Sequence, residues 1–158
     1  MSAEPDLPSP PPGAADHRLP ATPDTCFWGY FDPAQPPVLT VASGQTVDIE
    51  AVTHHAGDAP DLLMDDGIRA VWDGIPEASR TPGVHIMTGP IEVAGARPGD
   101  ALVVEILELR PRLPHGSNCA AHWGRLYEDF GKERITIYEL DGGTFPATAR
   151  PRFGFDFT

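Results

Sequence analysis

Apolar and polar residues alternate in several short stretches of this chain. In Gln45–Thr53, we expect Val47, Ile49 and Ala51 to face the core while the intervening residues face solvent. Arg134–Leu140 alternates in the same way, and phenylalanine occupies positions 153, 155 and 157. Successive side chains of a strand point to opposite faces, so this pattern predicts half-buried β-strands.

The longest apolar run, Ala101–Leu109, contains β-branched and leucine residues interrupted only by Glu105 and Glu108. A near-continuous run of this kind predicts a strand that is buried on both faces. Shorter apolar runs next to turn-forming residues predict three further strands, at Pro37–Val41, Val84–Met87 and Ile91–Ala94.

One segment, Asp61–Trp72, has the spacing of a short helix, with Asp61 as its predicted cap. Its apolar residues recur at helical intervals, at Leu63, Met64, Ile68 and Val71. One short helix among many short strands favours a mainly β fold. We expect a β-sandwich or barrel-like architecture with at most one or two short helices.

Composition narrows the class of protein. The 158 residues suffice for one domain, and 19 prolines with 16 glycines exclude coiled coils and helical bundles. Five prolines fall within residues 1–16, which predicts a disordered Pro-rich tail followed by a folded part over residues 17–158. The net charge of −12, with no basic cluster, argues against nucleic acid and anionic membrane surfaces as partners.

Targeting signals are missing from the sequence. No apolar stretch is long enough to span a membrane, and the N-terminal residues do not have the pattern of a secretory signal. The two cysteines have no metal-binding or redox spacing and are interpreted as free thiols. We therefore expect a cytoplasmic protein.

Histidines and carboxylates in turn-rich segments are the candidates for chemistry, since no nucleophile elbow, P-loop or dinucleotide-binding motif is present. His54 and His55 follow a predicted strand and precede Asp58. They are interpreted as metal ligands or a general base, or else as a polar loop pair. His85 lies in an apolar strand beside a turn, where it is either functional or a hydrogen-bonded core histidine.

The remaining candidates are interpreted mainly as structural. Three histidines are read as surface or packing residues: His17, His115 and His122. Asp65 and Asp66 are read as a solvated helix face. Cys119 lies in a segment that resembles a nucleophile loop, but a thiolate needs a nearby base or positive field, and this acidic chain offers few.

Three segments together resemble the signature of the acetamidase/formamidase family. They are His85–Leu109, with its Thr-Gly-Pro turn and Pro-Gly-Asp sequence, Ala21–Asp32, with its Trp-Gly-Tyr sequence, and Pro37–Val47. Thr53–Gly57 and Asp61–Asp66 resemble one branch of the same family. The resemblance spans about residues 17–157 and implies a β-rich, oligomeric amidohydrolase.

The reaction implied by this resemblance is hydrolysis of short aliphatic amides, formamide or acetamide, to a carboxylate and ammonia. Family members are longer, and the later segments that carry much of their site have no counterpart in this sequence. Residues 17–158 are therefore expected to form an acetamidase/formamidase-like domain that is truncated at its C-terminal end and inactive by itself.

A metal-bound water would supply the nucleophile and polarise the amide at neutral pH. We expect His54, His55 and His85 to bind a divalent metal, with zinc favoured because imidazole suits it. His85 and Asp58 are the expected catalytic residues. The expected partners are a small amide substrate and either further copies of the chain or a partner chain. The alternative is a non-catalytic β domain, or half of a split enzyme, that binds a partner chain.

Overall fold

The computed structural model describes residues 15–52, 63–83, 85–120, 127–129, 132–140 and 149–157. In chain order the elements of this part are β1 (His17–Leu19), β2 (Cys26–Trp28), β3 (Leu39–Val41), β4 (Val47–Ile49), α1 (Asp66–Gly74), the 3-10 helix η2 (Glu77–Ser79), β5 (Ile86–Thr88), β6 (Ile91–Val93), β7 (His115–Ala120), the 3-10 helix η3 (Tyr127–Asp129), β8 (Glu133–Leu140) and β9 (Ala149–Phe157). The prediction of a mainly β fold with short strands and little helix is confirmed. No helix among these residues is long and apolar enough to cross a membrane.

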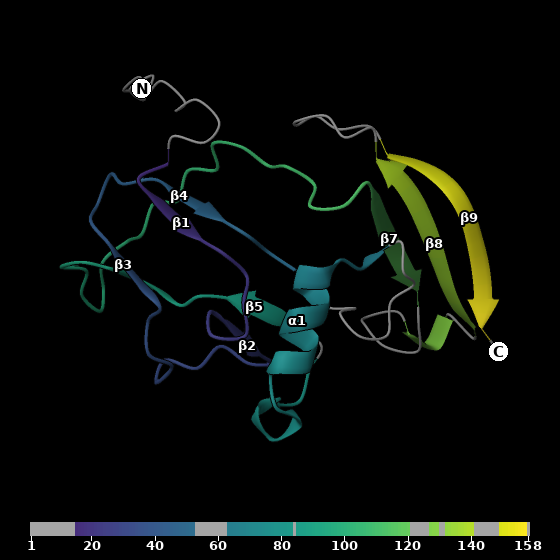
Figure 1. The fold of residues 1–158 in the computed structure, drawn as a ribbon, viewed down its shortest axis with the longest axis horizontal. Helices are drawn as coiled ribbons and strands as arrows, with labels where there is room; N and C mark the ends of the chain where they lie inside the picture. Colours follow the sequence, from purple (N-terminus) through teal and green to yellow (C-terminus); the bar gives the residue numbers. More distant parts are fainter. Residues whose placement is uncertain are drawn as a thin grey trace.

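The first six strands form three two-stranded ladders, each of which joins segments far apart in the sequence (Figure 1). β1 pairs with β4 and β3 pairs with β6, both in parallel, whereas β2 pairs with β5 in the antiparallel sense. β5 and β6 are adjacent in the chain and are separated by a turn at the cis Gly89–Pro90 bond. They nevertheless pair with different strands, β5 with β2 and β6 with β3.

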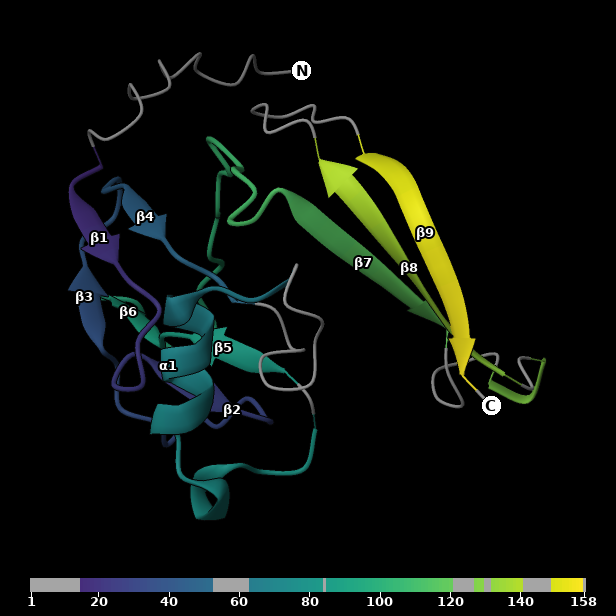
Figure 2. The same cartoon turned by 45° about the vertical axis from the view of Figure 1, so that its right-hand side comes forward.

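The last three strands form an antiparallel sheet in the order β7-β8-β9. Figure 2 shows this sheet on one side of the molecule, apart from α1 and the first six strands. The alternating segments predicted at Arg134–Leu140 and at the end of the chain are both strands, and Phe153 and Phe155 lie opposite Ile137 and Ile135. The sequence around Cys119 resembles a nucleophile loop, an interpretation that the sequence analysis did not favour. It instead forms β7, with Cys119 opposite Ile135.

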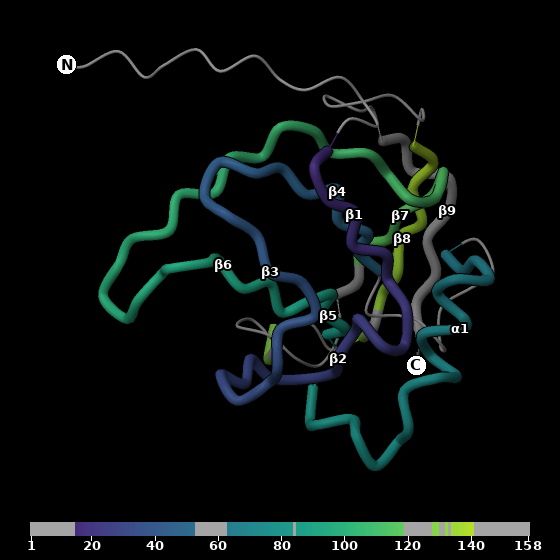
Figure 3. Tube along the Cα trace, turned by 60° about the vertical axis from the view of Figure 1, so that its left-hand side comes forward, coloured from purple at the N-terminus to yellow at the C-terminus, as the bar shows by residue number. Residues whose placement is uncertain are grey.

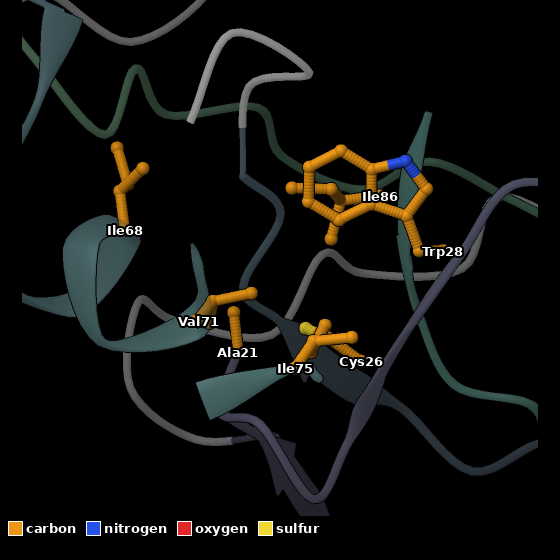
Figure 4. Packing of buried hydrophobic residues seen from close by; sticks show 7 residues of the cluster. All are labelled: Ala21, Cys26, Trp28, Ile68, Val71, Ile75 and Ile86. Atoms are coloured by element: carbon orange, nitrogen blue, oxygen red, sulfur yellow. The ribbon is translucent and has the colours of Figure 1, made fainter. Parts of the chain in front are cut away.

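The core lies between α1 and the β2–β5 ladder (Figure 4). Ile68, Val71 and Ile75 of the helical segment meet Trp28 of β2 and Ile86 of β5. Ile68 and Val71 are 1% and 0% exposed, so the predicted helical spacing of apolar residues is correct. The helix begins at Asp66 and is capped by Asp65, whose side chain accepts a hydrogen bond from the Ile68 N–H. The predicted cap, Asp61, lies outside the described residues.

Arg80 lies over the rings of both Trp28 and Trp72, with its guanidinium carbon 4.7 and 4.3 Å from the ring centroids. The two indoles meet edge-on at 5.2 Å. The Arg80 guanidinium also donates hydrogen bonds to the carbonyls of Trp72 and Ile75, at the C-terminal end of α1. A cation at this end of a helix stabilises the unpaired carbonyls. Arg80 therefore ties the end of α1 to β2.

Two expectations about strands are wrong. In the predicted strand Gln45–Thr53 only Val47–Ile49 is paired, and Ile49 and Ala51 are exposed, because the β1–β4 ladder has no layer over that face among the described residues. The predicted buried strand Ala101–Leu109 is an unpaired, exposed segment. Its apolar sequence suits two covered faces, but the described part of the chain supplies no neighbouring strand.

Candidate functional site

His85 immediately precedes β5, and its carbonyl accepts a hydrogen bond of 2.9 Å from the Gly29 N–H at the end of β2. The side chain of His85 is exposed, while that of the next residue, Ile86, is buried in the core. The interpretation of His85 as a core histidine is therefore wrong. The β2–β5 ladder holds its backbone in place and leaves the imidazole at the surface.

The other predicted site residues, His54, His55 and Asp58, lie outside the described residues. Both flanks of their segment are described: Glu50–Val52 on one side and Leu63–Asp65 on the other. The Thr88 hydroxyl in β5 donates a 2.7 Å hydrogen bond to the Glu50 carbonyl. Val52 packs against the core cluster that also contains Ile86. The chain thus enters the histidine-bearing segment beside the strand that His85 precedes.

Arg112 joins the two flanks of this segment. Its Nε and Nη2 donate to the two Asp65 carboxylate oxygens at 2.7 and 3.1 Å, and its Nη1 donates to Glu50 Oε2 at 3.4 Å. Glu50 is also held by Arg18, at 2.7 Å, and by the Ala21 N–H, at 3.2 Å. A guanidinium fork matches carboxylate oxygens in this bidentate geometry. The contacts clamp the start and the end of the segment that carries His54 and His55.

The contacts of Arg112 with Asp65 and Glu50, here called the Arg112 clamp, shift the pKa values of these groups. The hydrogen bond from Arg112 is the main cause that lowers the pKa of Asp65 below its ordinary value, followed among the favourable causes by the Ile68 N–H. The hydrogen bond from Arg18 and then the Ala21 N–H lower the pKa of Glu50. The hydrogen bond to Asp65 raises the pKa of Arg112. All three groups therefore stay charged near neutral pH, and Asp65 and Glu50 are suited to positioning rather than to proton transfer.

The motif that contains Thr22, Thr25 and Trp28 positions β5. The Thr25 hydroxyl accepts a hydrogen bond from the Thr22 N–H at 2.9 Å and donates to the Pro20 carbonyl at 2.6 Å. The Thr25 carbonyl accepts from the Gly89 N–H at 2.9 Å. The Trp28 indole N–H donates to the Gly83 carbonyl at 2.9 Å. The contact at Gly83 precedes His85 in the chain, and the contact at Gly89 follows it. The motif therefore holds the backbone on both sides of His85 in place.

The described residues contain no group of three or more His, Cys, Asp or Glu side chains that could hold a metal ion. A metal site that uses His85 would therefore take further ligands from outside the described residues. The minor candidates lie elsewhere: His17 contacts Gln45 at 3.0 Å, and His115 is in β7. Cys26 is buried, and burial is the main cause that raises the pKa of its thiol, so it is an unreactive core residue.

Sequence reasoning missed Glu50, Asp65 and Arg112. Asp65 was interpreted as part of a solvated helix face, but it caps α1 and pairs with Arg112. Its position before an apolar helical run was a usable capping signal. Arg112 stands between two prolines with no pattern around it, and its partner lies 47 residues away. No local signal could have identified that pair.

The sequence profile of the acetamidase/formamidase family matches residues 16–155, and the chain belongs to this family. It is 50% identical over 42 residues to an acetamidase of Mycolicibacterium smegmatis, a match that covers 25% of this chain and 10% of the relative. It is 31% identical over 133 residues to a protein of Schizosaccharomyces pombe that is provisionally named a formamidase, covering 80% of this chain and 30% of the relative. The chain thus spans less than a third of the length of either relative.

Proposed function

We propose that this chain forms part of an amidohydrolase site that converts short aliphatic amides, such as formamide and acetamide, to a carboxylate and ammonia. The family match over residues 16–155 carries this proposal. The Arg112 clamp supports it, because it holds both flanks of the segment bearing His54 and His55 while β5 holds His85 close to the first flank. The alternative of a non-catalytic β domain is not favoured by the family match.

Amide hydrolysis requires that a water oxygen bond to the amide carbon, that the carbon–nitrogen bond break and that the departing nitrogen gain a proton. We assign Asp58 as the general base that takes the proton from water. His85 stands beside the reacting amide, where its imidazole either protonates the departing nitrogen or serves as a metal ligand. Its exposed side chain on a fixed backbone fits both roles.

Three imidazoles, from His54, His55 and His85, are a donor set that would suit zinc. When bound, a divalent metal of this kind would lower the pKa of a water molecule to about 7. The residues of this chain would then orient the substrate, exclude bulk water and accept the proton. The clamp of Arg112 on Glu50 and Asp65 keeps the ends of the ligand-bearing segment at a constant separation.

The complete site includes residues beyond this chain. The two relatives are covered to only 10% and 30% of their lengths, so most of their sequence has no counterpart in the matched region. Catalytic groups must be held within a fraction of an ångström by a supporting shell. We therefore expect little turnover by the chain alone and activity when it replaces the matched region within a full-length relative.

Ammonia release from formamide and acetamide tests this function. The assay compares the chain alone with a chimera in which the chain replaces the matched region of the S. pombe protein. We expect the chimera to release ammonia and Asp58→Asn or His85→Ala to reduce its kcat/KM at least about 100-fold. His17→Ala is the matched control, because His17 contacts Gln45 in the β1–β4 region. A folded chimera that releases no ammonia, or variants as active as the control, would contradict the proposal.

A further inference from the structure

Residues 101–110, the apolar segment, lie at the surface without a neighbouring strand. The five exposed apolar side chains of the segment, between 57% and 90% exposed, are Leu102, Val103, Val104, Ile106 and Leu109. No backbone hydrogen bond joins residues 101–110 to any other residue of the described part of the chain. A row of unpaired N–H and C=O groups flanked by apolar side chains is a template for strand pairing.

The apolar segment follows a local turn and ends beside two ion pairs. At its start, the Arg97 N–H donates to the Asp100 carboxylate at 2.8 Å and the Asp100 N–H donates to the Arg97 carbonyl at 3.0 Å. At its end, Arg110 contacts Asp48 at 3.5 Å and Arg112 is bound to Asp65. Figure 3 shows the chain turning back after β6 and leading to β7, and residues 101–110 of this stretch form neither helix nor strand. The ion pairs hold the end of the segment against the rest of the chain, which lowers the entropy cost of pairing.

The side chains show which surface the segment would present. Leu102, Val104 and Ile106 share one face, and Val103 and Leu109 share the other with Glu105, since side chains alternate along a strand. Glu108 is within 3.5 Å of Arg110. Both faces are therefore mainly apolar, with the Glu105 carboxylate as the one acidic group of the segment that has no ion pair with a described residue.

We propose that the apolar segment pairs with a β-strand from the part of the acetamidase/formamidase unit that lies outside the region matched by this chain. The S. pombe relative is covered to 30%, so about two thirds of its length is available to supply that strand. The strand forms main-chain hydrogen bonds with residues 101–110 and covers their apolar side chains. A basic residue on it lies opposite Glu105, where it balances the carboxylate.

A second copy of this chain fits the segment less well. Each copy carries a net charge of −12, so two copies repel each other. Pairing the segment with itself also adds a second Glu105 to the same small ladder, and like charges close together on a ladder are destabilising. A strand from the remaining part of the family unit does not bring a second Glu105 to the ladder.

Hydrogen exchange followed by mass spectrometry tests this pairing. The proposal rests on family membership rather than on the amidase activity, so it is measured without an activity assay. The amides of residues 102–109 are compared in the chain alone and in the chimera with the S. pombe protein, with β8 as the internal reference. We expect β8 to be protected in both, and the segment to exchange at least about 100-fold more slowly in the chimera.

A pair of variants with matched exposure separates pairing from general surface effects. Val103 and Phe31 are both 90% exposed. We expect Val103→Lys to leave the Tm of the chain alone unchanged and to remove the protection of the segment in the chimera. Phe31→Lys should change neither. A lower Tm for Val103→Lys in the chain alone would show that the segment packs within this chain, and would overturn the proposal.

Three further outcomes would overturn it. The segment could be protected in the chain alone at low concentration, which would mean that residues of this chain cover it. Protection could rise with the concentration of the chain alone, which would identify a second copy as the partner. The segment could exchange as rapidly in the chimera as in the chain alone while β8 is protected in both, which would mean that no strand of the relative pairs with it.

Discussion

Arg112 and Asp65 are 47 residues apart in the sequence and form a bidentate pair with nitrogen–oxygen distances of 2.7 and 3.1 Å. Asp65 also caps α1, and Arg112 also reaches Glu50 beyond β4. The pair therefore connects the start of the helix, the end of a strand and the chain that leads into β7. Five predictions follow from these contacts and from the packing around them.

Arg112→Ala should lower the free energy of unfolding by about 1–2 kcal/mol, the lower part of the range for hydrogen bonds to charged groups. The contribution of the Arg112–Asp65 pair to stability stays in this range because its side chains are 27% and 31% exposed and water screens their charges. Urea denaturation measures the change. Arg18→Ala is the matched control, since it removes a more exposed partner of Glu50 and should have the smaller effect. Equal effects of the two substitutions would contradict the clamp.

The stability of the chain should fall in acid. The pKa values of Asp65 and Glu50 lie below their ordinary values of 3.8 and 4.5, so these groups bind protons more readily in the unfolded chain. Their contribution is present above the ordinary values and is lost as the pH falls through the lower values of the folded state. Urea midpoints measured between neutral pH and about pH 3 should show this loss. The loss should be smaller in Arg112→Ala, and an equal loss would contradict the mechanism.

Ile68→Ala should cost about 2–5 kcal/mol of stability, because it leaves a cavity between α1 and the β2–β5 ladder. Ile68 is 1% exposed, whereas Ile106 in the apolar segment is 70% exposed. The same substitution at Ile106 should leave the urea midpoint of the chain alone nearly unchanged. A large effect at Ile106 would mean that the apolar segment is packed in the chain alone.

Gly29→Ala should destabilise the chain by about 1–3 kcal/mol, because Gly29 has a φ of 107° and an added Cβ would collide with the Thr81 side chain. Its N–H also holds the His85 carbonyl, so the substitution should shift the backbone signals of β5 in an NMR spectrum. Gly44→Ala is the control. Gly44 has a φ of 85° with nothing within 4 Å, so it shares the backbone strain without the collision and should cost less.

Zinc titration tests the proposed metal ligands. If His54, His55 and His85 converge, the protein should bind about one equivalent of zinc. Calorimetry measures this binding. His85→Ala should weaken this binding at least about 10-fold, whereas His17→Ala should leave it unchanged. No zinc binding, together with amidase activity of the chimera that survives chelation, would assign the chemistry to carboxylates and leave these histidines with a structural role.

The spacing of apolar residues predicted a helix or strand correctly where those residues are buried in the core. The helical spacing within Asp61–Trp72 predicted a short helix, and the structure has it at Asp66–Gly74, with Ile68 and Val71 on the face that meets the core. The alternation in Arg134–Leu140 predicted a strand, which the structure has at Glu133–Leu140 with Ile137 fully buried. β7 was missed because residues 115–120 have the composition of a turn. They form a strand because β8 offers a partner for each of them.

The sequence by itself determined the mainly β class, the position of the helix, the acidic surface and the motifs that mark the acetamidase/formamidase family, because each of these depends on residues that are close together in the chain. Only the tertiary structure decided that Arg112 clamps Glu50 and Asp65, that His85 is exposed beside β5, and that residues 101–110 are left without a neighbouring strand. These features depend on which distant segments meet. An apolar run indicates that a segment should be covered, but it does not indicate which strand covers it.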